Sequence, residues 1–314
     1  MPCFSPLTGY RSKTVNPSGK RSIVFSPEQG FTDRKVEVPC GQCIGCRLEY
    51  SRQWAIRCVH ESSLYTFNIF ITLTYDEDSL PPFGSLDKKH FQDFMKRFRK
   101  RFKGYDPVVK DDGDVHYPIR YYHCGEYGEK NGRPHYHAII FNFRFPDQVL
   151  LYSNSRGNNY DSDILRELWP FGRVHIGDVT FDSAAYVARY CTKKITGEWK
   201  HHNYQIVREE DGEVIGEVLP EYSTMSRRPG IGKTWFDKYK KEIYNSDSVI
   251  INGHEVRPPK YYDNQFELEV PDGLLSLKKE RKRLGKKYDE GTERLRVKEN
   301  VTKKKLATLT PRKL

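Results

Sequence analysis

Long apolar runs are missing from this sequence, and no stretch approaches the length that a membrane-spanning helix needs. The first residues, Met1-Pro2-Cys3-Phe4, lack the basic stretch and apolar core of a secretory signal peptide, so we expect none. The seven cysteines are odd in number and unevenly spaced, which argues against the disulfide framework of a secreted protein. We therefore expect a protein that works in a reducing cytoplasm, with no membrane partner.

The composition is not that of a disordered chain. Apolar residues make up 37% of the 314 residues, and they include 21 Tyr, 17 Phe and 4 Trp. A chain of this kind can bury a core, and its 18 Pro and 23 Gly predict many turns.

Positive charge is concentrated near the end of the sequence. Residues 278–314 hold 15 Lys or Arg against 5 Asp or Glu, a net +10 out of +11 for the whole chain. Such a tail is either a solvated, partly disordered arm or a non-specific contact to phosphates, and the two interpretations are compatible. The overall basic balance favours nucleic acid as a partner.

Apolar periodicity predicts alternating strands and helices. We expect helices over residues 47–60, 87–103, 161–168 and 183–194, and strands over residues 66–75, 119–126, 134–143 and 173–179. This order indicates an α+β fold with a central antiparallel sheet flanked by helices. Residues 195–270 alternate short strands and turns too weakly to be placed.

The segment 87–103 has the clearest helical pattern. Its apolar positions recur at helical spacing, and Asp87 or Ser85 is a candidate N-cap. The opposite face carries cations, which are either a solvated face or a DNA contact: Lys96, Arg97, Lys100 and Lys103.

A His-x-His pair lies in the predicted strand 134–143. His135 and His137 leave the strand on one face, so both imidazoles can reach a single metal ion. Glu126 joins them only if the register places it opposite His135 or His137, and Glu129 in the turn is the fallback. Two imidazoles and a carboxylate leave positions open for water or phosphate oxygen, which suits Mg²⁺ or Mn²⁺. The alternative is a pair of structural histidines beside a turn.

Tyr186 and Tyr190 lie one helical turn apart in the predicted helix 183–194. Each is followed three residues later by a cation, Arg189 or Lys193, that favours the phenolate. Paired phenols on one face permit two successive phosphoryl transfers. An i, i+4 tyrosine pair is otherwise aromatic packing.

Three segments occur in the order of the motifs of HUH endonucleases, which initiate rolling-circle replication. They are Ile71-Thr72-Leu73-Thr74, Arg133-Pro134-His135-Tyr136-His137 and Tyr186-Val187-Ala188-Arg189-Tyr190-Cys191-Thr192-Lys193. The N-terminal Met-x-Cys and the run Pro39-Cys40-Gly41-Gln42-Cys43-Ile44-Gly45-Cys46-Arg47 are similar to the replication initiation proteins of gokushoviruses, small single-stranded DNA phages of the Microviridae.

The resemblance implies a mechanism. A metal on His135, His137 and Glu126 polarises the scissile phosphate, and one tyrosine attacks it to leave a 5′-phosphotyrosyl link and a free 3′-OH. Host polymerase and helicase then copy the origin-bearing single-stranded or replicative-form DNA in the bacterial cytoplasm, and the second tyrosine closes the circle. Lys193 would stabilise developing charge. The cations expected to bind DNA are Arg133, Arg189 and Lys194.

Cys40, Cys43 and Cys46 form a C-x2-C-x2-C cluster near the N-terminus. Cys3 is the expected fourth ligand, with Cys58 or His60 as substitutes, and tetrahedral Zn²⁺ is favoured over an iron–sulfur cluster or free thiols. Cys124 and Cys191 lie in predicted core elements and are expected to be inert.

Four segments follow from these features. They are a cysteine-rich, irregular N-terminal segment with its helix (1–63), a nicking core (64–200), a family-specific extension (201–274) and a basic tail (275–314). Two alternatives for the whole protein stay open, namely a zinc-stabilised DNA-binding protein without chemistry and an HUH plasmid initiator or transposase.

Overall fold

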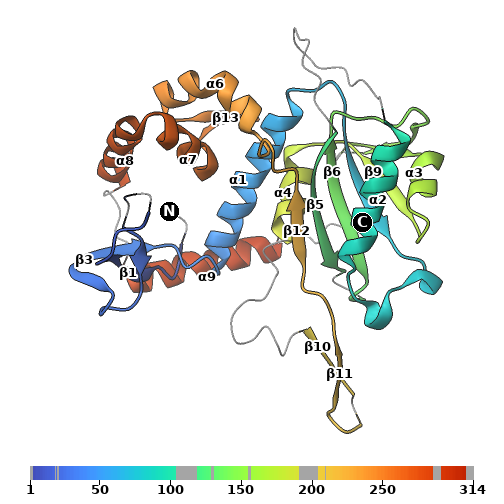
Figure 1. The fold of residues 1–314 in the computed structure, drawn as a ribbon, viewed down its shortest axis with the longest axis horizontal. Helices are drawn as coiled ribbons and strands as arrows, with labels where there is room; N and C mark the ends of the chain where they lie inside the picture. The colour runs from blue at the N-terminus through green and yellow to red at the C-terminus, as the bar shows by residue number, and fades with distance from the viewer. Residues whose placement is uncertain are drawn as a thin grey trace. The chain divides into compact units, whose positions relative to one another are not determined.

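The computed structural model describes residues 3–17, 19, 21–103, 119–128, 131–154, 157–190, 204–208, 210–285 and 291–308, and Figure 1 shows their elements. The chain divides into two compact units, Met1–Tyr50 with Ser276–Leu314, and Ser51–Leu275. The four functional segments expected from the sequence remain a prediction.

The larger unit is built on an antiparallel sheet whose strands differ in length. Its described strands follow the order β12-β5-β6-β4-β9-β8-β7, and each neighbouring pair is antiparallel. The predicted α+β class with an antiparallel sheet is confirmed. The strands are β4 (Asn68–Thr74), β5 (Arg120–Tyr127), β6 (Pro134–Phe141), β7 (Val149–Asn154), β8 (Gly157–Asp161), β9 (Val174–Gly177) and β12 (Tyr222–Met225).

Helices α2 (Lys88–Arg101) and α3 (Asp163–Leu168) cover one face of this sheet (Figure 1). The Asp87 carboxylate accepts a hydrogen bond from the backbone of Lys89 at 2.7 Å and so caps α2. The apolar stripe expected for this helix is buried against the sheet: Phe91, Phe94, Met95 and Phe98. Short 3₁₀ turns, Glu77–Ser79 and Pro82–Gly84, connect β4 to α2.

Helices α1 (Ile44–Ser62) and α4 (Phe181–Tyr190) pack on the opposite face of the sheet and form a second apolar core with it. The α4 residues in this core are small, Ala184 and Ala188 among them, which lets the helix backbone approach β5 and β6 closely. Cys58 of α1 and Cys124 of β5 are fully buried in the same core, as inert small side chains.

The later part of the segment that the sequence could not place packs on α1, whereas its strand β12 belongs to the main sheet. Ile56 of α1 packs with Phe236 and Tyr262 in a third apolar cluster. The elements are α6 (Lys233–Ser246), β13 (Val249–Ile251), β14 (His254–Val256) and α7 (Lys260–Glu269), preceded by the ribbon β10 (Gln205–Val207) and β11 (Val214–Glu217).

The smaller unit is more regular than expected. The N-terminal segment holds an antiparallel sheet of β1 (Leu7–Ser12), β2 (Ile23–Val24) and β3 (Gly30–Val38), so the prediction of an irregular segment was wrong. Only Val36-Glu37-Val38 at the end of β3 alternates apolar and polar residues, which is too short a pattern to predict this sheet.

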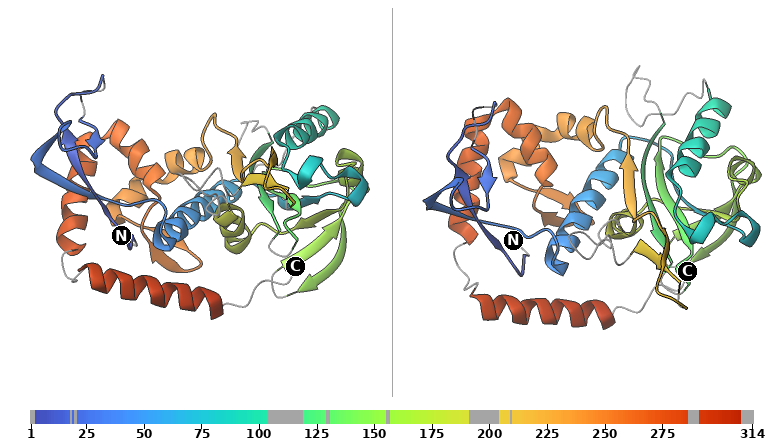
Figure 2. Two further views of the ribbon diagram at one scale, coloured as in Figure 1. Left: turned by 90° about the horizontal axis from the view of Figure 1, so that it is seen from below. Right: turned by 60° about the horizontal axis from the view of Figure 1, so that its bottom comes forward.

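The basic tail is largely helical in its described part. It contains the end of α8 (Pro271–Gly285) and all of α9 (Thr292–Thr308), which Figure 2 shows as one uninterrupted helix. Residues 292–308 are thus helical, and most of their side chains are exposed, as in a solvated arm. None of the helices in the described ranges is both long and apolar enough to cross a membrane.

Candidate active site

The β5–β6 hairpin decides whether Glu126 can meet the two histidines. Glu126 pairs with His135, and Cys124 pairs with His137, so Glu126, His135 and His137 share one face of the sheet. The required register is therefore present. Glu126 and His137 are fully buried, and the His135 side chain is only 13% exposed.

These three side chains form a compact group, hereafter the triad. Oε1 of Glu126 lies 2.7 Å from Nε2 of His135 and 2.9 Å from Nε2 of His137. Oε2 of Glu126 is buried and has no hydrogen-bond partner among the described residues. A buried carboxylate with an unsatisfied oxygen, next to two imidazole nitrogens, fits a divalent cation because all the donor atoms lie within 4.8 Å of one another.

Neighbouring groups orient the imidazoles. Nδ1 of His135 lies 3.0 Å from the carbonyl of Arg133, and Nδ1 of His137 lies 2.9 Å from Oγ1 of Thr72. These contacts direct both Nε2 atoms toward Glu126, as outer partners of metal-binding histidines do. Burial lowers the pKa of His137 more than the adjacent Glu126 carboxylate raises it, so the imidazole is neutral, the form that binds metal.

Tyr186 of α4 reaches the triad. Its ring centroid lies 5.0 Å from that of His137, with the ring planes at 86°. Helix α4 packs on β5 and β6, which brings residue 186 to strands that are about fifty positions away in the sequence. The remaining predicted site residues lie outside the described residues or have side chains outside them: Glu129, Arg189, Tyr190, Cys191, Lys193 and Lys194.

Arg133 is bound to protein groups. Its guanidinium donates from Nε and Nη2 to the carbonyl of Tyr75 at 3.2 and 2.9 Å, and it pairs with Glu77 through Nη1. It thereby ties the end of β4 to the start of β6. Its role in binding DNA stays a prediction.

A pocket of about 570 Å³ lies next to the triad and is lined by residues at the ends of strands. Its lining contains Thr72, Thr74, Tyr75, Asp76, Glu77, Arg133, Arg173, Val174 and His175. His175 was not anticipated from the sequence. Thr72 of β4 pairs with His137 on β6 at one side and with His175 on β9 at the other. The two histidines therefore lie on the same face of the sheet. The alternation Arg173-Val174-His175 was the available signal, but only the strand order reveals this proximity.

The cysteine cluster is assembled as expected, from Cys3, Cys40, Cys43 and Cys46. Backbone amides of Cys40 and Phe4 donate to the sulfurs of Cys3 and Cys43, each at 3.3 Å. Burial raises the pKa of the Cys43 thiol, but hydrogen bonds from the backbone of Phe4 and Cys46 outweigh it and lower the pKa to about 7. Four sulfurs with amide donors fit a metal such as zinc.

Cys3 is the fourth member of the cluster, so the alternative ligands Cys58 and His60 are not needed. Cys58 is buried in the apolar core under the sheet. His60 stacks on Trp235 with a centroid distance of 3.5 Å, and its Nδ1 lies 2.9 Å from the hydroxyl of Tyr262. Cys58 thus belongs to the core that α1 and α4 form on the sheet, and His60 to the cluster of Ile56, Phe236 and Tyr262.

Comparisons with known proteins identify relatives of this chain. Residues 68–195 match the family model of the replication-associated protein ORF2/G2P. The replication-associated protein VP4 of Bdellovibrio phage phiMH2K is 35% identical over 276 residues, which cover 87% of this chain and 79% of the relative. The replication-associated protein ORF2 of Spiroplasma virus 4 is 33% identical, with 80% of this chain and 74% of the relative covered.

A third relative is more distant. The replication-associated protein ORF4 of Chlamydia phage 1 is 28% identical, with 76% of this chain and 58% of the relative covered. No solved structure matches the chain. The identity and coverage of the first two relatives establish that the chain belongs to the family of replication-associated proteins of the Microviridae.

Proposed function

We propose that this protein nicks single-stranded DNA at the phage replication origin and becomes covalently attached to it through a tyrosine. The observation that carries the proposal is the 5.0 Å separation between the rings of Tyr186 and His137. A tyrosine thus lies next to a buried carboxylate and two imidazoles, the combination that metal-assisted phosphoryl transfer needs.

Glu126, His135 and His137 would hold the metal. When bound, Mg²⁺ or Mn²⁺ supplies a Lewis acid that polarises the scissile phosphate, and the two imidazoles favour Mn²⁺. The protein keeps His137 neutral by burial and holds its ring through Thr72. Both features favour ligation without a competing proton.

The tyrosine performs the transfer. Its phenol loses a proton, and the phenolate oxygen attacks phosphorus in line with the bond to the 3′ oxygen. The P–O3′ bond breaks, the 3′ oxygen takes up a proton, and the 5′ phosphate stays on the tyrosine as a phosphodiester. The free 3′-OH is the primer for host polymerase, which works with host helicase in the bacterial cytoplasm.

Tyr190, one helical turn beyond Tyr186, would carry out the second transfer. After one round of copying it attacks the regenerated origin, and the released 3′-OH then displaces Tyr186, or the reverse order, to close the circle. Lys193 would stabilise the developing phenolate. Arg133, Arg189 and Lys194 would contact the DNA backbone.

The cysteine cluster has a structural role in this proposal. Zn²⁺ on Cys3, Cys40, Cys43 and Cys46 would join the N-terminal residues to the start of α1. A zinc-stabilised DNA-binding protein without chemistry would account for this cluster but not for a buried carboxylate between two imidazoles. Family membership also disfavours a plasmid initiator or transposase.

The test is formation of a covalent adduct. The full-length protein is incubated with labelled single-stranded DNA tiled across the phage genome and with Mn²⁺, and is then boiled in detergent. We expect a labelled protein band, and mass spectrometry of its nucleotide-linked peptide should name Tyr186 or Tyr190. His137→Ala should lose the adduct and keep the fold, whereas Tyr152→Phe, an exposed tyrosine on β7, should retain the adduct. Absence of an adduct from every fragment would refute the proposal.

A further inference from the structure

A second pocket lies on the face of the sheet opposite to the triad. Successive residues of a strand point to opposite faces, so His123 of β5 faces α2, whereas Cys124 faces α4 with the triad. The pocket has a volume of about 500 Å³, which is in the range of small-ligand sites. It is lined by Lys88, Phe91, Gln92, Met95, Lys96, Arg99, Tyr121, His123, Tyr222 and Thr224.

The floor of this pocket contains two buried polar atoms whose hydrogen bonds are not satisfied. His123 is 0% exposed, stacks on Phe91 with a centroid distance of 3.3 Å, and places Nδ1 3.0 Å from Oγ1 of Thr224. Its Nε2 has no partner in the described part of the chain, and neither has the hydroxyl of Tyr222. A buried polar group that stays unpaired destabilises the folded protein, so a ligand that supplies the missing hydrogen bond is favoured.

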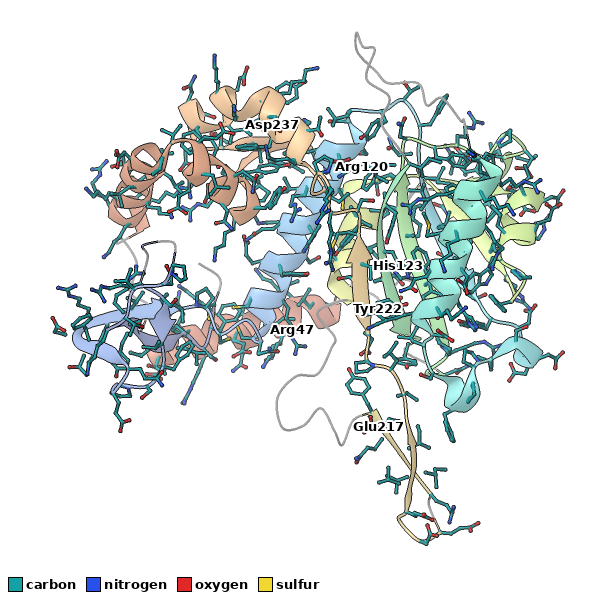
Figure 3. The ribbon with its side chains drawn as sticks, viewed as in Figure 1. Arg47, Arg120, His123, Glu217, Tyr222 and Asp237 are labelled. Atoms are coloured by element: carbon teal, nitrogen blue, oxygen red, sulfur yellow. The ribbon has the colours of Figure 1, made fainter. Side chains whose placement is uncertain are left out.

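The two side chains belong to neighbouring strands. Figure 3 labels His123 on β5 and Tyr222 on β12, the edge strand of the sheet, and their rings meet edge to face at 5.5 Å. Tyr222 pairs with Gly125, where an added Cβ would come within 2.9 Å of the tyrosine ring. The glycine therefore allows Tyr222 to pack against the sheet at the wall of the pocket.

Cations line the rim. Lys88 and Arg99 are exposed residues of α2, and neither has an acidic partner among the described residues. Nζ of Lys88 lies 5.0 Å from the ring centroid of Tyr222, and Cζ of Arg99 lies 5.7 Å from that of Tyr121. Lys96 pairs with Asp93 at 3.1 Å and is less available.

We propose that this pocket binds one nucleotide, with its base against Tyr121 and Tyr222, the hydrogen-bonding edge of the base toward Nε2 of His123, and its phosphate on Lys88 and Arg99. Aromatic walls and buried polar atoms suit a heteroaromatic base, which offers both a stacking face and a hydrogen-bonding edge. The two cations at the rim suit the attached phosphate. A simple inorganic anion would leave the aromatic walls and the two buried polar atoms unused.

The nucleotide has two possible sources, a free nucleotide or one residue of a DNA strand, and both carry the same chemistry. In the second case the pocket is an anchor for DNA on the face opposite to the nicking site. The inference does not require the nicking chemistry, because no residue of the triad belongs to the pocket.

Binding is tested with fluorescent single-stranded oligonucleotides on the full-length protein, with deoxynucleoside monophosphates as competitors. Arg99→Glu and Lys88→Glu should each weaken binding about tenfold, the effect of losing roughly 1.4 kcal/mol. Lys100→Glu makes the same charge change at an exposed position of α2 outside the pocket and should change binding much less. Tyr222→Phe keeps the ring, removes the hydroxyl, and should alter the preference among bases.

Photo-crosslinking locates the bound base. An oligonucleotide containing iododeoxyuridine should crosslink to a peptide that includes Tyr121 or Tyr222, and Arg99→Glu should reduce the yield. Competition by monophosphates would assign the pocket to free nucleotides, and crosslinking without such competition would assign it to a strand. The inference is overturned if Arg99→Glu and Lys100→Glu bind equally and the crosslinks map elsewhere. Glu126→Gln should crosslink normally, which separates this result from a failure of the proposed nicking function.

Discussion

The Glu126 carboxylate lies 2.9 Å from Nε2 of His137, and both side chains are completely buried. A carboxylate in such a place needs a cation, because an isolated buried charge is costly. His137 cannot readily supply that charge, since burial lowers the pKa of its imidazole. The pair therefore points to an external cation, and this relationship leads to the first prediction.

Mn²⁺ should stabilise the folded protein through the triad. At about one hundred times its Kd, the ion should add about 2.7 kcal/mol to the free energy of unfolding, and so raise Tm by roughly 5–10 °C. Glu126→Gln should abolish this shift, as measured by thermal unfolding with and without Mn²⁺. Glu255→Gln removes an exposed carboxylate of β14 and should leave the shift intact. A full Mn²⁺ shift in Glu126→Gln would exclude the triad as the binding site.

The tyrosine pair should be jointly required for covalent attachment. Tyr186→Phe with Tyr190→Phe removes both hydroxyls, so the DNA adduct should disappear while DNA binding persists. Each single variant should still form an adduct but should stall before the circle is closed. These outcomes are read from adduct bands and circular products on the same gel. An adduct formed by the double variant would show that another residue is the nucleophile.

The thiol cluster should hold one zinc ion per chain. Cys43→Ser should lose the metal, as measured by elemental analysis of the purified protein, and should become sensitive to proteolysis within residues 1–46. Cys58→Ala alters a buried core cysteine and should retain the zinc. Zinc retention in Cys43→Ser together with zinc loss in Cys58→Ala would contradict the assembly of the cluster.

The histidine pair of the triad was predictable because it depends on local geometry, whereas the choice of Glu126 over Glu129 needed the register of the hairpin. The i, i+2 spacing of His135 and His137 fixes their common face, and a short turn limits the registers that bring Glu126 opposite them. The helix α2 was predictable for a similar reason, since its phenylalanines recur at the helical period.

Elements defined by distant pairing were not predictable. The strand β12 has only four residues, and its place in the sheet depends on its pairing with β5, about a hundred residues earlier. All residues of β7 are exposed, so this edge strand lacks the alternation that marks a half-buried strand. His175 and the pocket at His123 were missed for the same reason, because only the strand order brings their neighbours together.

Acid should destabilise the protein through His60. Burial lowers the pKa of this imidazole from 6.5 to about 3 in the folded state. The unfolded chain therefore binds the proton more readily between these pH values, so the stabilisation is complete above pH 6.5 and falls as the pH drops toward 3, by about 1.4 kcal/mol per unit. His60→Gln should reduce the slope of stability against pH by about 1.4 kcal/mol per unit in urea unfolding between pH 6.5 and 4, whereas exposed His254→Gln should leave it unchanged. Equal slopes in the two variants would contradict this assignment.

The buried ion pair of Arg120 and Glu61 joins β5 to α1 beneath the sheet. Nε of Arg120 donates to Oε1 of Glu61 at 2.6 Å, and both side chains are at most 3% exposed. Oε2 of Glu61 accepts the backbone N–H of Gly232 at 2.7 Å, and Arg120 also donates to the carbonyl of Pro229 at 2.7 Å (Figure 3 labels Arg120). The pair thus binds the loop before α6 to the strand that carries Glu126.

Loss of one partner should leave the other charge buried and unpaired. Arg120→Met should therefore lower the free energy of unfolding by about 3–5 kcal/mol. Arg166→Met breaks exposed pairs with Asp161 and Asp163 and should cost no more than about 1 kcal/mol. Urea unfolding of Arg120→Met, Glu61→Gln and the double variant completes the comparison. The double variant should lose less free energy of unfolding than the two single variants lose together. In Arg120→Met the Glu61 carboxylate stays buried without its partner, and Glu61→Gln removes that charge. Simple additivity would mean that the two side chains do not act as a pair.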